Sequence, residues 1–229
     1  MRLLLVGHGR MGKLVEDLAP EYGAAVAGVV TARDAELALR DGDFGPVDVA
    51  IDFTLADAVP RNLPLLAARG VNVVIGTTGW GVHEGELREV AANSGIGVLA
   101  APNFSIGMNL FQLAVEDAAR RFAPHDSFGA WVHELHHAAK KDAPSGTALQ
   151  LKTGMERAGY PRPIDIASTR AGSIPGIHTV GFDGPADTVT LTHTVRDRAV
   201  FARGALEAAR WLKGRQGWFT MRDVLTGET

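Results

Sequence analysis

The chain begins, after Met1 and Arg2, with Leu3-Leu4-Leu5-Val6-Gly7-His8-Gly9-Arg10-Met11-Gly12. A short apolar run, typical of a buried strand, leads directly into the pattern G-x-G-x-x-G, and residues 10–18 then favour a helix. Glycines at such a point let the backbone turn tightly and approach a pyrophosphate, whose charge faces the N-terminus of the helix. We interpret the segment from Gly7 to Gly12 as part of a dinucleotide site, and a plain glycine-rich turn is the alternative.

Further apolar runs follow in the first half of the chain, at residues 25–30, 47–53, 71–75 and 96–100. None of them alternates polar with apolar residues, which is typical of strands covered on both faces of a sheet. Residues 84–92 favour a helix, and residues 56–68 favour another in which Pro64 is expected to cause a kink or a break. Strands that alternate with helices predict an α/β fold with a Rossmann-like parallel sheet.

The pattern changes after residues 101–105, which we take as the boundary between two domains. The elements expected beyond it are a helix at 106–122, a strand at 130–132, a strand at 188–195 and a helix at 204–212. The strand at 188–195 alternates threonine with Val, Leu and His, which predicts a half-exposed strand of an antiparallel or mixed sheet. We therefore expect residues 1–103 to form a dinucleotide-binding domain and residues 104–204 to form a second, α+β domain with a mixed sheet.

The composition excludes several classes of protein. The 229 residues carry 23 Lys and Arg against 26 Asp and Glu, so the basic excess typical of nucleic-acid-binding proteins is absent. Cysteine is also absent, which excludes disulfides, thiolate metal sites and thiol nucleophiles and fits a reducing compartment. No apolar run approaches the roughly 18 residues of a membrane span. We expect a cytoplasmic protein that binds neither nucleic acid nor membrane.

The end of the second predicted strand bears on the choice of coenzyme. An acid about 20 residues beyond such a glycine loop usually binds the ribose 2′-hydroxyl. Here the sequence reads Thr31-Ala32-Arg33, and an arginine can instead pair with a 2′-phosphate. Arg33 therefore predicts NADPH as the coenzyme, with NADH as the alternative if Asp34 takes the acid's place. The other interpretation of Arg33 is a solvated surface cation.

The densest group of ionisable side chains includes His133-Glu134-Leu135-His136-His137 and Lys140-Lys141. The first five residues match the zinc motif H-E-x-x-H, in which two histidines on one helix bind the metal and the glutamate is the general base. The residues before His133 favour a strand, however, and residues four apart in a strand lie roughly 13 Å from one another. The two lysines would also repel a cation. We therefore expect no metal here.

The second interpretation of this cluster is an anion site with groups that transfer protons. Histidine gives and takes protons near neutral pH, and a lysine ammonium can act as an acid. Pro144 and the residues after it begin a predicted helix, whose backbone N–H groups and hydroxyls can bind a carboxylate or a phosphate. A substrate carboxylate would then meet His137, Lys140 and the amides of Ser145, Gly146 and Thr147. A solvated loop before a capped helix is the alternative.

At these residues the sequence resembles the 4-hydroxy-tetrahydrodipicolinate reductase, or dihydrodipicolinate reductase, family. The stretch from Glu134 to Ala148 is similar to the family's signature, which is long and specific. Shorter similar segments are Gly9–Gly12, Asp52–Thr54, Gly76–Gly79, Ala101–Ser105, Arg170–Gly172, Gly176–Thr179, Phe201–Ala205 and Met221–Leu225. The resemblance therefore extends over nearly the whole chain.

The resemblance implies a Rossmann domain and a C-terminal domain that binds substrate and forms a homotetramer, with helices of residues 205–229 returning to the first domain. It implies that NADPH or NADH reduces 4-hydroxy-tetrahydrodipicolinate to tetrahydrodipicolinate, in lysine and diaminopimelate biosynthesis. A hydride would reach C4 of a cyclic imine dicarboxylate, and water would be lost.

The resemblance also implies roles for particular residues. His136 would be the proton donor or acceptor and Lys140 the general acid, while the substrate carboxylates would contact His137, Ser145, Gly146 and Thr147. The implied coenzyme contacts are Gly7, His8, Gly9, Arg10, Met11, Gly12, Arg33, Gly76, Thr77, Thr78, Ala101, Pro102, Asn103 and Phe104. Ala32 replaces the acid that serves NADH in some members of the family, which favours NADPH.

Overall fold

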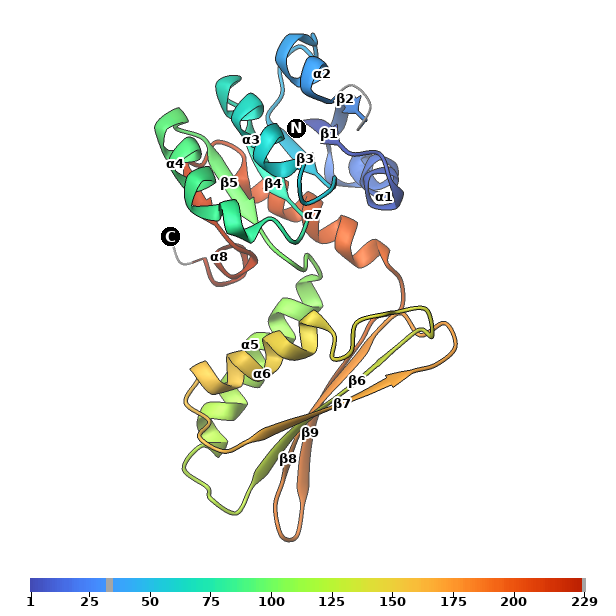
Figure 1. Cartoon of the computed structure of the whole chain (residues 1–229), viewed down its shortest axis with the longest axis vertical. Helices are drawn as coiled ribbons and strands as arrows, with labels where there is room; N and C mark the ends of the chain where they lie inside the picture. The colour runs from blue at the N-terminus through green and yellow to red at the C-terminus, as the bar shows by residue number, and fades with distance from the viewer. Residues whose placement is uncertain (32–34, 228–229) are drawn as a thin grey trace. The chain divides into compact units, whose positions relative to one another are not determined.

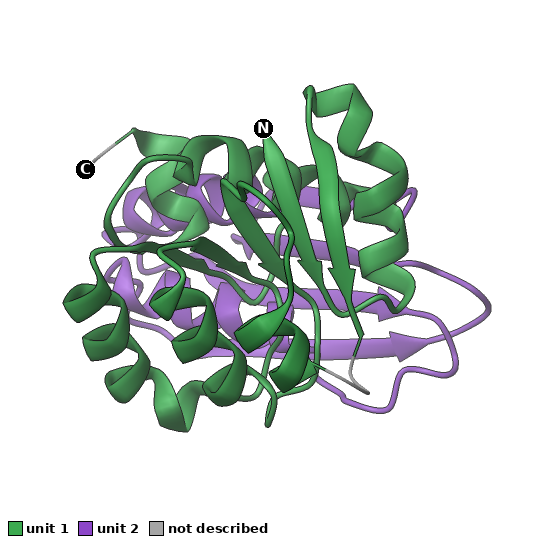
Figure 2. Cartoon of the chain, turned by 90° about the horizontal axis from the view of Figure 1, so that it is seen from above, with its two compact units in different colours: residues 1–106, 199–229 green, residues 107–198 purple. Residues whose placement is uncertain are grey.

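The computed structural model of this chain describes residues 1–31 and 35–227. The chain divides into two compact units, coloured separately in Figure 2. Unit 1 comprises residues 1–106 and 199–229, and unit 2 comprises residues 107–198. Among the described residues, no helix is long and apolar enough to cross a membrane.

Unit 1 is built on a six-stranded sheet in the order β10-β5-β4-β3-β1-β2 (Figure 1). The strands are β1 (Arg2–Val6), β2 (Ala25–Val30), β3 (Val49–Asp52), β4 (Asn72–Ile75), β5 (Gly97–Ala100) and β10 (Gly217–Phe219). All neighbouring pairs are parallel. The predicted Rossmann-like sheet is confirmed, and the short strand β10 is an addition that the sequence did not indicate.

Helices cover both faces of this sheet. They are α1 (Arg10–Leu18), α2 (Ala35–Asp41), α3 (Val59–Ala68), α4 (Glu84–Ser94), α7 (Ala199–Leu212) and α8 (Met221–Thr226), with short 3₁₀ turns η1 (Ala19–Tyr22) and η2 (Gly81–His83). The expected break at Pro64 is wrong, since Pro64 lies inside α3. Leu63, Leu66 and Ala67 of the same helix are buried in the core. Their packing offsets the roughly 3 kcal/mol that an interior proline costs a helix.

The first strand shows why the apolar runs do not alternate. Leu3 and Leu5 pack on one face of the sheet, in a core to which α1 and α7 also contribute. Leu4 and Val6 pack on the other face, in a core to which α3 and α4 contribute. Every residue of the run is therefore buried, as expected for a strand inside a parallel sheet.

Unit 2 is a mixed four-stranded sheet in the order β7-β6-β8-β9, with two helices across one face (Figure 1). Its elements are α5 (Ile106–Phe122), β6 (Gly129–His136), α6 (Gly146–Arg157), β7 (Ile164–Arg170), β8 (Ile177–Asp183) and β9 (Thr188–Thr194). β6 and β7 are parallel, whereas β6–β8 and β8–β9 are antiparallel, so the predicted mixed sheet is confirmed. Strand β6 is longer than the predicted 130–132 and continues to His136.

Candidate active site

The glycine-rich turn lies at the carboxyl edge of the unit 1 sheet, directly after β1. Gly7 has a φ of 91°, and a Cβ there would lie 2.5 Å from the carbonyl oxygen of Phe53. A Cβ at Gly12 would lie 2.1 Å from the carbonyl oxygen of Gly7. Position 12 must therefore be glycine for α1 to begin this close to the end of β1. Gly9 is the N-cap of α1 and offers no side-chain cap to the first turn. That end of the helix can therefore receive an anion.

A cavity of about 780 Å³ opens beside this turn and is lined by Gly7, His8, Gly9, Thr31 and Thr54, among others. The cavity lies where β1 and β3 end, and the strand order reverses between these two strands. Ligands of open α/β sheets bind at the carboxyl ends of the strands at such a point. The turn and the cavity together fit a dinucleotide.

A smaller cavity of about 280 Å³ lies beyond β4 and β5, and its lining includes Thr77, Thr78, Ala101 and Pro102. Seven predicted coenzyme residues thus line one or the other cavity. Arg10, Met11, Gly12, Gly76, Asn103 and Phe104 line neither of these two cavities. Phe104 is instead buried in the core. Arg33 lies outside the described residues.

The buried carboxylate of Asp52 connects the loop after β3 with the loop after β4, a role that the resemblance of Asp52–Thr54 to the family did not assign to it. Asp52, at the end of β3, accepts hydrogen bonds from the backbone and hydroxyl of Thr54, at 2.9 and 2.6 Å. The amide of Asn62 donates to it at 2.9 Å and the hydroxyl of Thr77 at 3.3 Å. Burial raises the pKa of Asp52, and these hydrogen bonds oppose the rise. Asp52 therefore positions the loop that contains Thr77.

In unit 2, the helix-facing side of β6 contains two ionisable residues of the predicted cluster, Glu134 and His136. Glu134 and His136 are two residues apart on the strand and so share one face, where they are 0% and 9% exposed. The neighbouring strands place His178 opposite Glu134 and Arg170 opposite His136. The period-two spacing of Glu134 and His136 is the signal that would have identified this pair, had the strand been extended past residue 132.

The Glu134 carboxylate accepts hydrogen bonds from several neighbouring residues. Arg170 donates to it through both terminal nitrogens, Nη1 at 3.0 Å and Nη2 at 2.7 Å. His136 Nδ1 bonds to Oε2, and the backbone N–H of Ser145 donates to Oε1 at 3.3 Å. Burial raises the pKa of this carboxylate, but hydrogen bonds from Arg170, Ser168 and His136 together lower it to about 2. Glu134 is therefore ionised at neutral pH.

The two histidines of this group favour their neutral forms. Burial lowers the pKa of His136, and the adjacent cations Lys140 and Arg170 lower it further against the opposing effect of Glu134. Burial also lowers the pKa of His178 to about 4. Because Nδ1 of His136 donates to Glu134, its Nε2 is the atom left to exchange a proton.

The remaining predicted residues follow β6 in the chain. Lys140 lies in the loop between β6 and α6, and its ammonium pairs with the Asp142 carboxylate at 2.8 Å. The backbone N–H of Lys140 donates to the carbonyl of His137, which begins this loop. Ser145 caps α6 by accepting from the N–H of Ala148 at 3.2 Å. Gly146 and Thr147 form the first turn of α6.

The structure also bears on the zinc interpretation of His133 to His137, which requires these histidines to lie on one helix. His133 lies in strand β6, not in a helix, and its Nε2 is 3.0 Å from the hydroxyl of Thr169. Among the described residues, Glu134, His136 and His178 do form a group whose ligand atoms lie within 4.8 Å of one another. Because the Arg170 guanidinium already occupies both oxygens of Glu134, this group favours proton exchange over binding a cation.

Comparisons with known proteins agree with this geometry. Residues 1–104 match the family described as "Dihydrodipicolinate reductase, N-terminus", and residues 107–225 match the corresponding C-terminus. The 4-hydroxy-tetrahydrodipicolinate reductase of Christiangramia forsetii is 32% identical over 99% of this chain and 98% of its own. That of Thiobacillus denitrificans is 39% identical over 92% of this chain and 83% of its own.

A solved structure shows the same fold. It is described as a dipicolinate-bound dihydrodipicolinate reductase from Paenisporosarcina sp. TG-14. It matches this chain with a TM-score of 0.79 at 22% identity, over 96% of this chain and 97% of that one. The two units thus share the architecture of that protein.

Proposed function

Because this chain belongs to the dihydrodipicolinate reductase family and is an NAD(P)H-dependent reductase of 4-hydroxy-tetrahydrodipicolinate, we propose that His136 and Lys140 form its proton-transfer pair. The reaction belongs to lysine and diaminopimelate biosynthesis. The observation that carries the proposal is the bond from His136 Nδ1 to the ionised Glu134, which leaves Nε2 for exchange. Lys140 is near enough to lower the pKa of His136 by its charge.

The chain's own residues then have separate tasks in the reaction. When bound, the nicotinamide coenzyme supplies a hydride. Reduction also consumes a proton and releases water, so an acid must stand close to the substrate. Lys140 is that acid, and His136, neutral and oriented by Glu134, gives or takes a proton at Nε2. The Lys140 ammonium also stabilises the negative charge that develops on the ring.

The substrate carboxylates are assigned to the start of α6, at Ser145, Gly146 and Thr147, and to His137. A helix N-terminus attracts anions, and α6 has no acidic residue in its first turn. Ser145 Oγ accepts from the N–H of Ala148 and lies 3.3 Å from Nε2 of His178, so this side chain positions the start of α6 beside the histidines. The dipicolinate bound to the Paenisporosarcina protein is a dicarboxylate and supports this substrate class.

NADPH is proposed as the preferred coenzyme over NADH. The argument rests on Arg33, whose guanidinium can pair with a 2′-phosphate, and on the absence of an acid at position 32. The glycine turn of unit 1 supports pyrophosphate binding at Gly7, Gly9 and the first turn of α1. Unit 1 is thus the dinucleotide-binding domain, to which the C-terminal segment 205–229 returns.

Unit 2 is proposed to assemble a homotetramer in the cytoplasm, besides binding substrate. β9 is an edge strand of its sheet, and Val189 on it is 42% exposed. Exposed edges of this kind pair readily with another chain. Light scattering at micromolar concentration is expected to give the mass of a tetramer, and a monomer would contradict this part of the proposal.

The test of the proton-transfer pair follows NADPH oxidation with freshly prepared substrate. His136→Ala and Lys140→Ala are each expected to lower kcat by roughly 10²- to 10⁴-fold, the usual contribution of general acid–base catalysis. His133→Ala, on the same strand, and Lys141→Ala, beside Lys140, are the matched controls and should stay near wild type. Turnover close to wild type in Lys140→Ala would remove the lysine from the mechanism.

A further inference from the structure

We propose that Glu134 and Arg170 act as one positioning unit that fixes His136 on β6 and Lys140 in the following loop relative to each other. This inference rests on the proton-transfer pair proposed above and extends it to two residues that do not themselves take part in the proton transfer. The unit consists of the buried carboxylate of Glu134 and the half-buried guanidinium of Arg170, both in unit 2.

Arg170 connects the strand to the loop. Its two terminal nitrogens donate to the two oxygens of Glu134, and Nη2 also donates to the backbone carbonyl of Asp142. The Asp142 carboxylate in turn pairs with the Lys140 ammonium at 2.8 Å. The Arg170 guanidinium thus fixes the position of Asp142 relative to β6, and Asp142 in turn holds the Lys140 ammonium.

Glu134 orients the other partner. Oε2 bonds to Nδ1 of His136, which fixes the ring and its tautomer, and Oε1 accepts from the backbone N–H of Ser145. The same carboxylate therefore contacts the strand that contains His136 and the N-terminus of α6. An ionised carboxylate beside an imidazole also stabilises the imidazolium.

The geometry requires an arginine at position 170. The fork of Arg170 makes two parallel bonds to Glu134 while one nitrogen also reaches the loop, and a lysine ammonium has no such planar arrangement. Arg170→Lys keeps the charge and loses this fork. Misplacement of a reacting group by about 1 Å can cost about 100-fold in rate. We expect kcat of Arg170→Lys to fall by about tenfold to a hundredfold.

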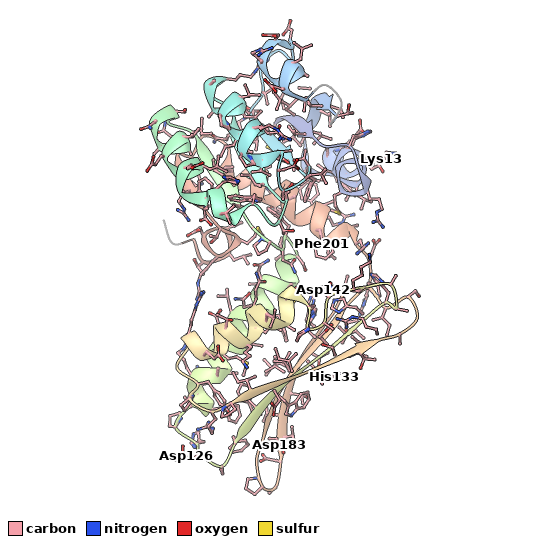
Figure 3. All side chains as sticks on the ribbon, viewed as in Figure 1. Lys13, Asp126, His133, Asp142, Asp183 and Phe201 are labelled. Carbon is pink, nitrogen blue, oxygen red and sulfur yellow. The ribbon has the colours of Figure 1, made fainter. Side chains whose placement is uncertain are left out.

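Unit 2 offers a matched control in Arg162. Its side chain is 19% exposed against 17% for Arg170, and it too makes several bonds, to the carbonyls of Phe122, Ala123 and Phe128 and to Asp126. Figure 3 shows that Asp126 lies at the opposite end of unit 2 from Asp142. Arg162→Lys should therefore lower Tm without changing kcat.

Glu134→Gln tests the charge of the carboxylate. The groups that face His136 are Glu134 on β6, Arg170 on β7, His178 on β8 and Lys140 in the loop. Glu134 is the anion of this group, so its replacement by an amide lowers the pKa of His136. The limb of the kcat/KM profile that belongs to His136 is expected to move to lower pH by about one unit.

A third variant, Asp142→Asn, tests the proposal at an exposed side chain, in case the substitutions of Glu134 and Arg170 prevent folding. The Asp142 side chain is 56% exposed, so Asp142→Asn should fold normally while it releases the Lys140 ammonium. We expect a lower kcat with an unchanged Tm. For every variant, NADPH affinity measured by fluorescence serves as a check on unit 1 and should stay within about twofold of wild type.

The outcomes separate this inference from the proton-transfer pair. Wild-type kcat and an unshifted pH profile in Arg170→Lys, Glu134→Gln and Asp142→Asn would overturn the positioning unit, even if His136→Ala and Lys140→Ala are inactive. An equal loss of kcat in Arg162→Lys would also overturn it, because the effect would then be one of general stability. Full turnover of His136→Ala and Lys140→Ala would instead refute the pair itself.

Discussion

Gly176 lies directly against the Nε2 atom of His136: a Cβ at position 176 would be 3.2 Å from this nitrogen. Because Nδ1 of the same ring bonds to Glu134, Nε2 is the atom available for proton exchange. The chain just before β8 therefore passes close to Nε2 at a glycine, where no side chain blocks access to this nitrogen.

Substitution at position 176 should therefore impair proton transfer. In Gly176→Ala the new methyl group forces the His136 ring to shift by a few tenths of an ångström, and we expect kcat to fall roughly tenfold. Coenzyme affinity, measured by fluorescence titration, should not change. Gly159→Ala, just after α6 in unit 2, is the control, because Gly159 also has a positive φ (94°, against 155° at Gly176) but open space around the added Cβ. A wild-type kcat in Gly176→Ala would show that Nε2 does not exchange the proton.

Removal of the Asp52 carboxylate should weaken coenzyme binding. Asp52→Ala leaves the donors of Thr54, Asn62 and Thr77 without their acceptor. A buried donor without a partner costs about 1–3 kcal/mol, and about 2–4 °C per kcal/mol for a chain of this size gives a fall in Tm of about 2–12 °C. The KM for coenzyme should rise by about tenfold, because the loop with Thr77 loses its anchor.

The conservative variant Asp52→Asn separates geometry from charge. Burial raises the pKa of Asp52, so the ionised form is penalised in the folded protein. A neutral amide removes that penalty, and it can keep its bonds if the Asn62 amide turns over. We expect it to recover most of the affinity that Asp52→Ala loses, whereas Asp117→Ala, an exposed site in unit 2, should resemble wild type. Equal losses in both Asp52 variants would argue against a purely geometric role.

The stability of unit 2 should decrease in mild acid. The folded pKa of His178 is about 4, below its ordinary value of 6.5. The unfolded state therefore binds the proton first, and the stabilisation that is present above pH 6.5 is lost as the pH falls toward 4. Each proton taken up on unfolding contributes about 1.4 kcal/mol per pH unit to the slope. Glu134, with a pKa lowered from 4.5 to about 2, adds a further loss below pH 4.5.

Urea unfolding between pH 8 and pH 4.5 measures this dependence. His178→Asn should flatten the curve below pH 6.5, although His136 and His193, whose pKa values burial also lowers, keep part of the slope. His83→Asn removes a half-exposed histidine of unit 1 and serves as the control for the substitution itself. An undiminished slope in His178→Asn would assign the proton uptake to other groups.

The choice of coenzyme should depend on Arg33. A charge-assisted bond to a 2′-phosphate contributes about 1.5–3 kcal/mol, less at an exposed position, so Arg33→Ala should raise the KM for NADPH by about tenfold. The KM for NADH should be nearly unchanged. Arg210→Ala removes an exposed arginine that pairs with Glu207 on α7 and is the control. A wild-type KM for NADH equal to or below that for NADPH would contradict this prediction.

The sequence alone determined the elements whose causes are local. The run Leu3–Val6, the turn at Gly7–Gly12 and helix α1 follow from apolar patterning and from backbone angles that glycine permits, and both are properties of neighbouring residues. The helix start at Ser145 follows in the same way from its capping hydroxyl. Gly7 and Lys140 were therefore found as candidates from the residues themselves, whereas Thr77 and the role of His136 came from the resemblance to the reductase family.

Only the tertiary structure decided which residues meet. Arg170 is 36 residues from Glu134 in sequence, and His178 is 33 from Ser145, so no local pattern joins them. They come together because β7 and β8 pair with β6 in one particular register. Pro64 stays helical for a related reason, since the packing of Leu63 and Leu66 outweighs its local preference. Burial and strand pairing act between distant segments, and they therefore determined the environment of the site.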